Sequence, residues 1–310
     1  MNNEYVIDVH GLVKKFGYKT AVDGVDLQMP QGQVWGFLGP NGSGKTTTIR
    51  MICGLLAISA GAGRCLGYDI SENASQIKAR TGYMTQHFSF WEDMTIRENL
   101  EFVARIYALP DQRERVETTL DDLGLAQRAN QLAGALSGGW KQRLALAAVT
   151  MHEPELLLLD EPTAGVDPQA RREFWDEIHR LSLAGMTILV STHYMDEAER
   201  CDHIVYLANG KKVVEGSVEE IIQASGLKTL RAEGEETRSI APILKGKPGV
   251  DHVAYYGAAL HVSSRQPRVL KSTLEGLEQD HVRWIDVRPS LEDAFIALMD
   301  EAGADRRLHS

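Results

Sequence analysis

The sequence predicts an α/β protein in which a parallel sheet is wound with helices. Residues 34–38 form a short apolar run that stops at a glycine-rich turn, and a helical pattern follows with Ile49 and Ile52 on one face. Residues 156–159 and 187–191 are further apolar runs of strand length, typical of strands that are buried on both faces. Buried strands that alternate with helices indicate a parallel sheet covered by helices.

Composition narrows the class of protein. The chain has 310 residues, enough for one large domain and a smaller one. Its formal net charge is −10, whereas proteins that bind nucleic acid through the phosphates usually carry a basic face. We therefore expect no nucleic-acid partner. The three cysteines, Cys53, Cys65 and Cys201, form no C-x-x-C pair, and we interpret them as reduced, mostly buried thiols.

The pattern changes along the chain in a way that suggests two domains. We expect a first domain over residues 1–225, with a mostly helical subdomain over about 90–150, and an accessory α+β domain over 226–310. Expected elements of the second domain are strands at 250–256, 260–263 and 282–287, a helix at 267–279, and a final helix that Ser290 would cap.

The turn after residues 34–38 follows the pattern G-x-x-x-x-G-K-[ST], the P-loop that binds nucleotide phosphates. Glycines permit a tight turn whose main-chain N–H groups converge on phosphate oxygens, and the next helix directs its positive N-terminal end at the same oxygens. Lys45 would contact the β- and γ-phosphates, and the Thr46 hydroxyl would ligate Mg²⁺. The predicted nucleotide-binding residues of this loop are Gly39, Pro40, Asn41, Gly42, Ser43, Gly44, Lys45, Thr46 and Thr47.

Two carboxylates follow the leucine run 156–159. A parallel sheet delivers Asp160 and Glu161 to the edge where the P-loop also emerges. Asp160 would hold Mg²⁺, directly or through water, and Glu161 would polarise the water that attacks the γ-phosphate. The alternative is a strand that merely ends in solvated acids, but the P-loop upstream favours the catalytic interpretation.

Residues 136–140, Leu-Ser-Gly-Gly-Trp, stand at the start of a helical stretch. Together with the P-loop and the Asp-Glu strand, in this order and spacing, they resemble the signature of ABC transporter ATPases, which normally reads Leu-Ser-Gly-Gly-Gln. Trp140 departs from that pattern at the fifth position, whereas the serine and both glycines are kept. The resemblance covers residues from about 5 to 225 and implies a P-loop NTPase of the ABC ATPase type with a helical signature subdomain.

The resemblance implies further site residues. Gln86 matches the glutamine that reaches toward Mg²⁺, His193 matches the histidine that contacts the γ-phosphate, and Asp167 matches the D-loop aspartate. Phe16 matches the aromatic that stacks on adenine, with Tyr18 as an alternative. The implied catalytic residues are Glu161, His193 and Gln86, and the implied Mg²⁺ ligands are Thr46, Gln86 and Asp160.

In this family two copies face each other head to tail, and each ATP lies between the P-loop of one copy and the signature of the other. The resemblance therefore implies ATP and Mg²⁺ as cofactors and a second ATPase subunit, in a homodimer, as partner. The residues that would act on the other copy's ATP are Ser137, Gly138 and Gly139.

The resemblance also implies separate transmembrane permease subunits. Phe88, Phe90 and Trp91 suit the docking of a short helix from such a subunit, and internal packing is the alternative for them. No run approaches the roughly 18–20 apolar residues of a membrane span, and the first residues do not follow a signal-peptide pattern. We expect a cytoplasmic protein held at the inner face of the cell membrane through the permease.

Residues 289–295, Pro-Ser-Leu-Glu-Asp-Ala-Phe, resemble the ending of drug-exporter-type ABC ATPases, which implies export of a small molecule. An importer ATPase is the alternative, because importer subunits can also carry C-terminal domains. ABC ATPases that act on ribosomes or DNA generally carry two cassettes or a long coiled-coil insertion, and this chain shows one P-loop and no long heptad run. A purely regulatory ATP binder would be expected to lack Glu161 or His193, and both are present.

Overall fold

The structure, a computed structural model, describes residues 5–86, 89–234, 237–257, 259–275 and 282–298. The chain divides into two compact units, Met1–Lys212 and Val213–Ser310. The boundary precedes residue 225, where the sequence places the end of the first domain, so α8 (Val218–Ala224) belongs to the second unit. Among the described residues, no helix is both long and apolar enough to cross a membrane.

A six-stranded sheet has the strand order β10-β9-β3-β8-β7-β6, and apart from residues 213–216 of β10 its strands belong to the first unit. The neighbouring strands from β9 to β6 pair in parallel, which confirms the predicted parallel sheet. Every residue of β3 and β7 is buried, as expected for strands covered on both faces. The strands are β3 (Val34–Leu38), β6 (Thr81–Met84), β7 (Leu156–Asp160), β8 (Thr187–Thr192), β9 (His203–Ala208) and β10 (Lys211–Gly216).

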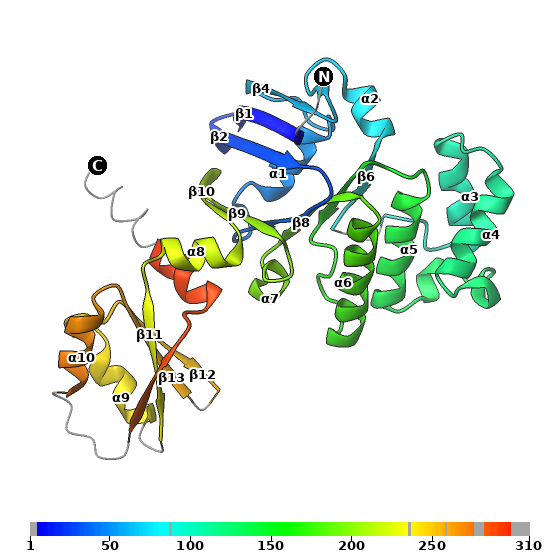
Figure 1. Cartoon of the computed structure of the whole chain (residues 1–310). Helices are drawn as coiled ribbons and strands as arrows, with labels where there is room; N and C mark the ends of the chain where they lie inside the picture. The colour runs from blue at the N-terminus through cyan, green and yellow to red at the C-terminus, as the bar shows by residue number, and fades with distance from the viewer. Residues whose placement is uncertain (1–4, 87–88, 235–236, 258, 276–281, 299–310) are drawn as a thin grey trace. The chain divides into compact units, whose positions relative to one another are not determined.

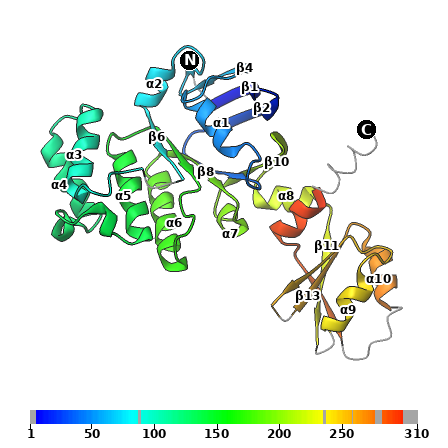
Figure 2. The same ribbon diagram turned by 180° about the vertical axis from the view of Figure 1, so that it is seen from behind.

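A second, antiparallel sheet has the order β2-β1-β4-β5. Helix α1 (Lys45–Ile52) lies between the two sheets (Figures 1 and 2). Its residues Ile49 and Ile52 are fully buried in one core with Val9 of the antiparallel sheet and Leu158 of the parallel sheet, so the start of α1 is held from both sides. The antiparallel strands are β1 (Tyr5–Phe16), β2 (Lys19–Pro30), β4 (Ala60–Cys65) and β5 (Tyr68–Asp69).

The helical part of the first unit is built from α3, α4 and α5, which lie beside α6 (Figure 1). Leu100, Leu120 and Leu144 come from these three helices and are fully buried in a core of their own. Thr95 starts α3 with a reciprocal cap, because its side chain accepts from the Glu98 amide and Glu98 accepts from the Thr95 amide. The remaining helices of this unit are α2 (Ala74–Ala79), α3 (Ile96–Ile106), α4 (Gln112–Asp122), η1 (Ala126–Arg128), η2 (Ala133–Ala135), α5 (Gly138–Thr150), α6 (Pro168–Leu183) and α7 (Met195–Ala198).

Helices α5 and α6 approach each other closely at their N-terminal ends. A Cβ atom on Gly139 would lie 2.6 Å from the Cβ atom of Ala170, a separation that real Cβ atoms do not show. Position 139 therefore needs glycine for packing. The same contact fixes where the signature turn lies relative to the start of α6.

The second unit is an α+β domain with a four-stranded sheet of order β12-β13-β11-β14, antiparallel at each pairing. Leu230, Leu260 and Val262 of the sheet pack with Leu244 and Leu270 of the helices α9 and α10. The Ser290 hydroxyl accepts from the Asp293 amide at 3.0 Å, which confirms the predicted cap of the final helix over 291–298. The elements are β11 (Lys228–Glu233), α9 (Thr237–Leu244), β12 (His252–Tyr256), β13 (Ala259–Ser264), α10 (Pro267–Glu275) and β14 (Arg283–Val287).

The three cysteines are buried and free of disulfide bonds, as the sequence predicts. Burial raises the pKa of Cys53 from 9.0 to about 11, and burial also raises the pKa values of Cys65 and Cys201. The thiols of the folded protein therefore stay neutral at a pH where the thiols of the unfolded chain begin to ionise. Above the unfolded pKa, ionisation favours the unfolded chain, and the free energy of unfolding falls as the pH rises further.

We expect the native protein to react slowly with a thiol reagent at about pH 8, because the thiolate is the reactive form and all three thiols are buried. The measurement is the rate of labelling of the native chain against the chain unfolded in urea. The unfolded chain should expose three reactive thiols at once. Rapid labelling of any of the three in the native state would contradict the burial of that cysteine.

Candidate functional site

The P-loop connects the end of β3 to the start of α1. Gly42 and Gly44 have φ angles of 79° and 106°, in the left-handed region that favours glycine. A Cβ atom on Gly39 would lie 2.2 Å from the Leu207 carbonyl oxygen, and one on Gly44 would lie 2.8 Å from the Ala21 carbonyl oxygen. These positions therefore have no room for a side chain, and the loop presents backbone to its concave side.

Two polar side chains of the loop fit a phosphate. Lys45 is 4% exposed, and its Nζ donates to the carbonyl oxygens of Gly39 at 2.7 Å and Pro40 at 3.2 Å. Desolvation by burial lowers the pKa of Lys45, against the opposing effect of the nearby Glu161 carboxylate. The buried Ser43 Oγ has no hydrogen-bond partner among the described residues. A phosphate oxygen would satisfy that hydroxyl and pair with the ammonium group, so the residues present fit a nucleotide phosphate.

The predicted metal ligands Thr46 and Asp160 are in direct contact. Thr46 Oγ1 donates to Asp160 Oδ1 at 2.9 Å, and Asp160 is 1% exposed. The Asp160 carboxylate also accepts from Ser191 Oγ at 2.7 Å and Tyr83 OH at 3.4 Å. These hard oxygen atoms suit Mg²⁺. Across the described ranges, no group of three His, Cys, Asp or Glu side chains could hold a metal ion.

Glu161 is the point where the other predicted catalytic residues meet. Its carboxylate accepts from Gln86 Nε2 at 3.0 Å and lies 3.2 Å from His193 Nδ1 and 3.5 Å from Lys45 Nζ. Glu161 is 8% exposed and has a φ of 47°, a conformation that costs about 1–3 kcal/mol for a residue with a side chain. The backbone is held there because the Glu161 amide donates to both the carbonyl and the hydroxyl of Ser191, at 3.1 and 3.0 Å.

Ser191 and Tyr83 are site residues that the sequence analysis misses. The parallel register pairs Asp160 with Ser191, which brings the serine hydroxyl beside the Asp160 carboxylate and the Glu161 amide. Ser191 stands two residues before His193 at the end of a predicted strand, and that position was the available signal. Tyr83 lies on β6, and its contact with Asp160 depends on the order of the strands, which the sequence does not specify.

The signature residues lie elsewhere in the same unit. Ser137 is the N-cap residue of α5, and Ser137 and Gly138 are exposed while Gly139 is buried. In the part of the chain that the structure describes, neither Ser137 nor Gly138 forms a hydrogen bond with the P-loop. Asp167 caps α6, since its Oδ1 accepts from the amides of Gln169 and Ala170 at 3.1 and 3.0 Å.

The predicted aromatic contacts have different outcomes. Phe16 is 51% exposed, with Lys14 Nζ 5.2 Å from its ring centroid, and Tyr18 is fully exposed. Phe90 packs against the core of the helical part, which favours the internal-packing alternative for that residue. Trp91 is 44% exposed and makes an edge contact with Phe102, whereas Phe88 lies outside the described residues.

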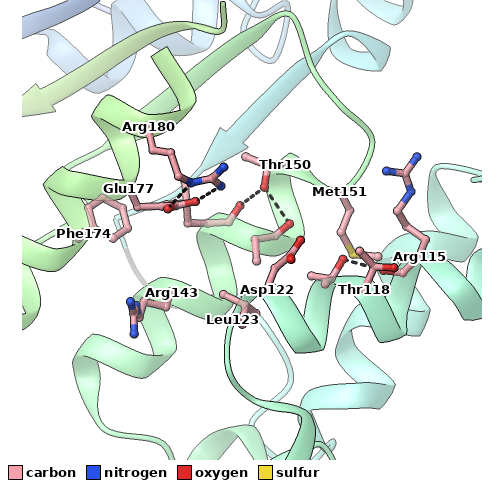
Figure 3. Close-up of a pocket in the computed structure, with 13 residues that line it drawn as sticks. Arg115, Thr118, Asp122, Leu123, Arg143, Thr150, Met151, Phe174, Glu177 and Arg180 are labelled. Atoms are coloured by element: carbon pink, nitrogen blue, oxygen red, sulfur yellow. Dashed lines mark hydrogen bonds and ion pairs between the residues drawn. The ribbon is translucent and has the colours of Figure 1, made fainter. Parts of the chain in front are cut away.

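A cavity of about 440 Å³ lies between α4, α5 and α6 (Figure 3). Its lining combines apolar side chains such as Met151 and Phe174 with the charged residues Asp122, Arg143 and Glu177. None of the predicted site residues lines it. The predicted nucleotide site therefore lies in the loops at the sheet edge and not at this cavity.

The fold and the site together define a P-loop ATPase. A family model described as "ABC transporter" matches residues 22–164. The Nod factor export ATP-binding protein I of Ralstonia nicotianae is 36% identical, with 94% of this chain and 93% of that protein covered. The daunorubicin/doxorubicin resistance ATP-binding protein DrrA of Streptomyces peucetius is 36% identical, with 97% and 94% covered. The chain therefore belongs to the ABC transporter family of ATP-binding proteins.

Other relatives match about seven tenths of the chain. The probable multidrug ABC transporter ATP-binding protein YbhF of Escherichia coli is 43% identical over 220 residues, and this match spans 70% of this chain but only 38% of that protein. A solved structure titled "Structure of ATP binding subunit of ABC transporter" is 28% identical, with a TM-score of 0.65 and with 71% of this chain and 93% of that chain covered. The chain carries the ATP-binding ATPase domain of this family.

We expect Lys45→Ala to weaken ATP binding by roughly 10-fold or more. The substitution removes the buried positive charge of the loop, which would pair with the phosphate beside the unpaired Ser43 hydroxyl. Titration calorimetry with ATP measures the Kd directly. Lys78→Ala on the exposed side of α2 is the matched control and should leave the Kd unchanged. Equal affinities for the two variants would contradict the assignment of the P-loop.

Proposed function

We propose that this chain is the ATP-hydrolysing subunit of an ABC transporter and that it energises export of a small molecule through separate permease subunits. The observation that carries the proposal is the convergence of Lys45, Gln86 and His193 on the buried carboxylate of Glu161. A phosphate-binding loop and a candidate base in one contact network are what hydrolysis of a nucleoside triphosphate needs.

The nucleotide would bind with its phosphates in the P-loop and its adenine against Phe16, or alternatively Tyr18. Backbone amides of the loop, the free Ser43 hydroxyl and the Lys45 ammonium group would hold the phosphate oxygens. Phosphate binding would draw Lys45 away from the Gly39 and Pro40 carbonyls that it contacts in this structure. Thr46, Asp160 and Gln86 would hold Mg²⁺, which when bound neutralises charge on the phosphates.

In the chemical step, a water molecule attacks the γ-phosphorus while the bond from that phosphorus to the β,γ-bridging oxygen breaks. ADP leaves with the electron pair, and inorganic phosphate is formed. The Glu161 carboxylate accepts the proton of the attacking water. His193, held 3.2 Å from Glu161, would donate to the γ-phosphate oxygens and orient that group.

The geometry of the signature supports a site completed by a second copy. Ser137 and Gly138 are exposed at the N-terminal end of α5, where free backbone amides favour an anion. Since neither residue reaches the P-loop of its own chain, we propose a homodimer in which they contact the ATP of the other copy, with Asp167 near the shared boundary. ATP would then hold the dimer closed, and hydrolysis would release it.

The partners across the membrane are also a proposal. The relatives that match nearly the whole chain are named for Nod factor export and for daunorubicin/doxorubicin resistance, and both names support export. We propose separate transmembrane permease subunits, a position at the cytoplasmic face of the membrane, and docking through Trp91 and its neighbours. The exported molecule is a small molecule whose identity would be set by the permease.

Glu161→Gln tests this function. We expect the variant to bind ATP with normal affinity and to hydrolyse it roughly 10²- to 10⁴-fold more slowly, because the amide cannot accept the proton. With Mg-ATP, its mass by light scattering should shift from monomer to dimer. Glu199→Gln, an exposed position near α7, is the control and should turn over normally. Normal turnover of Glu161→Gln would refute the base, and a monomer at saturating ATP would refute the shared site.

A further inference from the structure

Glu197 is a buried carboxylate that lies outside the predicted site. It is 1% exposed, on the short helix α7, and hydroxyl groups from two other segments donate to it. Thr192 Oγ1 donates at 2.7 Å, and Thr163 Oγ1 donates to the other carboxylate oxygen. Arg171 Nε lies 3.5 Å from the same carboxylate. A buried charge is costly unless its partners are held in place, so these segments are fixed relative to one another.

Each partner of Glu197 stands next to a residue of the site. Thr163 follows Glu161 by two residues, and Thr192 directly precedes His193. Arg171 lies one turn after Asp167, and the Arg171 amide donates to the Asp167 carbonyl oxygen at 2.9 Å. One carboxylate thus joins the turn after the candidate base, the end of β8 and the first turn of α6.

A second contact path runs along the surface of the same cluster. The Arg171 guanidinium carbon lies 4.4 Å from the Tyr194 ring centroid, and the Tyr194 ring lies 4.1 Å from the His193 ring. His193 in turn lies 3.2 Å from Glu161. Stacking between Arg171 and His193 leaves the Tyr194 ring little freedom to tilt, and the histidine ring is restrained with it.

We propose that Glu197, Arg171 and Tyr194 form a positioning unit that holds His193 and Glu161 in their catalytic geometry and ties them to the helix that Asp167 begins. The inference rests on the proposed function, since it concerns the same hydrolytic site. None of the three residues needs to touch the nucleotide. They act through His193 and Glu161, so their loss should slow the chemical step and leave the P-loop contacts with ATP intact.

Adjacent arginines on α6 provide the test. Arg171→Met removes the cation between Glu197 and Tyr194, whereas Arg172→Met changes an exposed neighbour on the same helix turn. We expect Arg171→Met to lower kcat of the full chain roughly 10- to 100-fold with KM for ATP unchanged, and Arg172→Met to behave as wild type. Arg171→Lys keeps the charge over the ring and should recover part of kcat. Equal kcat values for the two methionine variants, or a raised KM with normal kcat, would overturn the proposal.

Tyr194→Leu and the double variant with Arg171→Met test whether the contacts form one path. If they do, the double variant loses no more kcat than the worse single variant, since residues acting as a unit are not additive. If the two single losses in kcat multiply in the double variant, the residues act independently and the proposed positioning unit is overturned. Glu197→Gln should likewise lower kcat and leave KM unchanged. If this substitution at a buried position prevents folding, the variants of the more exposed Arg171 and Tyr194 decide the outcome.

The result separates this proposal from the function on which it rests. If the wild-type chain hydrolyses ATP and Glu161→Gln does not, the hydrolytic site stands, and only the behaviour of the Arg171 and Tyr194 variants decides the positioning unit. If the wild-type chain and Glu161→Gln hydrolyse ATP equally, the assigned base is refuted and the positioning role falls with it. The ATP affinity of each variant, measured in the Glu161→Gln background, should equal that of Glu161→Gln alone.

Discussion

A carboxylate that is almost excluded from water must find donors or cations within the protein, and Glu161 finds them in three separate segments. Lys45 comes from the start of α1, Gln86 from the segment after β6 and His193 from the end of β8. These three segments are far apart in the sequence. The arrangement of the parallel sheet brings them together, so the site can form only when the strand order is correct.

The strand order also explains why the backbone at Glu161 keeps its unfavourable conformation. The parallel register places Asp160 beside Ser191, and the carbonyl and hydroxyl of Ser191 then accept the Glu161 amide. The same hydroxyl donates to Asp160, so one serine restrains the Asp160 carboxylate and the Glu161 backbone. A positive φ at a residue with a side chain is retained because these contacts over-determine it. The strain and the position of the candidate base have the same structural cause.

The sequence predicted the elements of the fold well where short-range pattern determines them. The buried strands, the glycine-rich turn after residue 38 and the Ser290 cap each depend on residues close together in the chain, and each was predicted correctly. The contacts of Tyr83 and Ser191 with Asp160 depend on which strands are neighbours, and no periodicity encodes that. The elements at 228–244 were missed because charged and glycine residues interrupt the pattern there, and Pro242 lies inside α9.

Trp140 shows how a departure from a family pattern can be absorbed by packing. The indole is partly buried against the core of the helical part, with the guanidinium carbon of Arg143 5.0 Å from its ring centroid. An aromatic side chain at this position gains burial that an amide would not, and it turns the fifth signature residue toward the interior. The start of α5 is fixed independently, by the contact of Gly139 with Ala170. Ser137 and Gly138, the two exposed residues that precede Gly139, thus keep their place at the N-terminus of α5 without help from the Trp140 side chain.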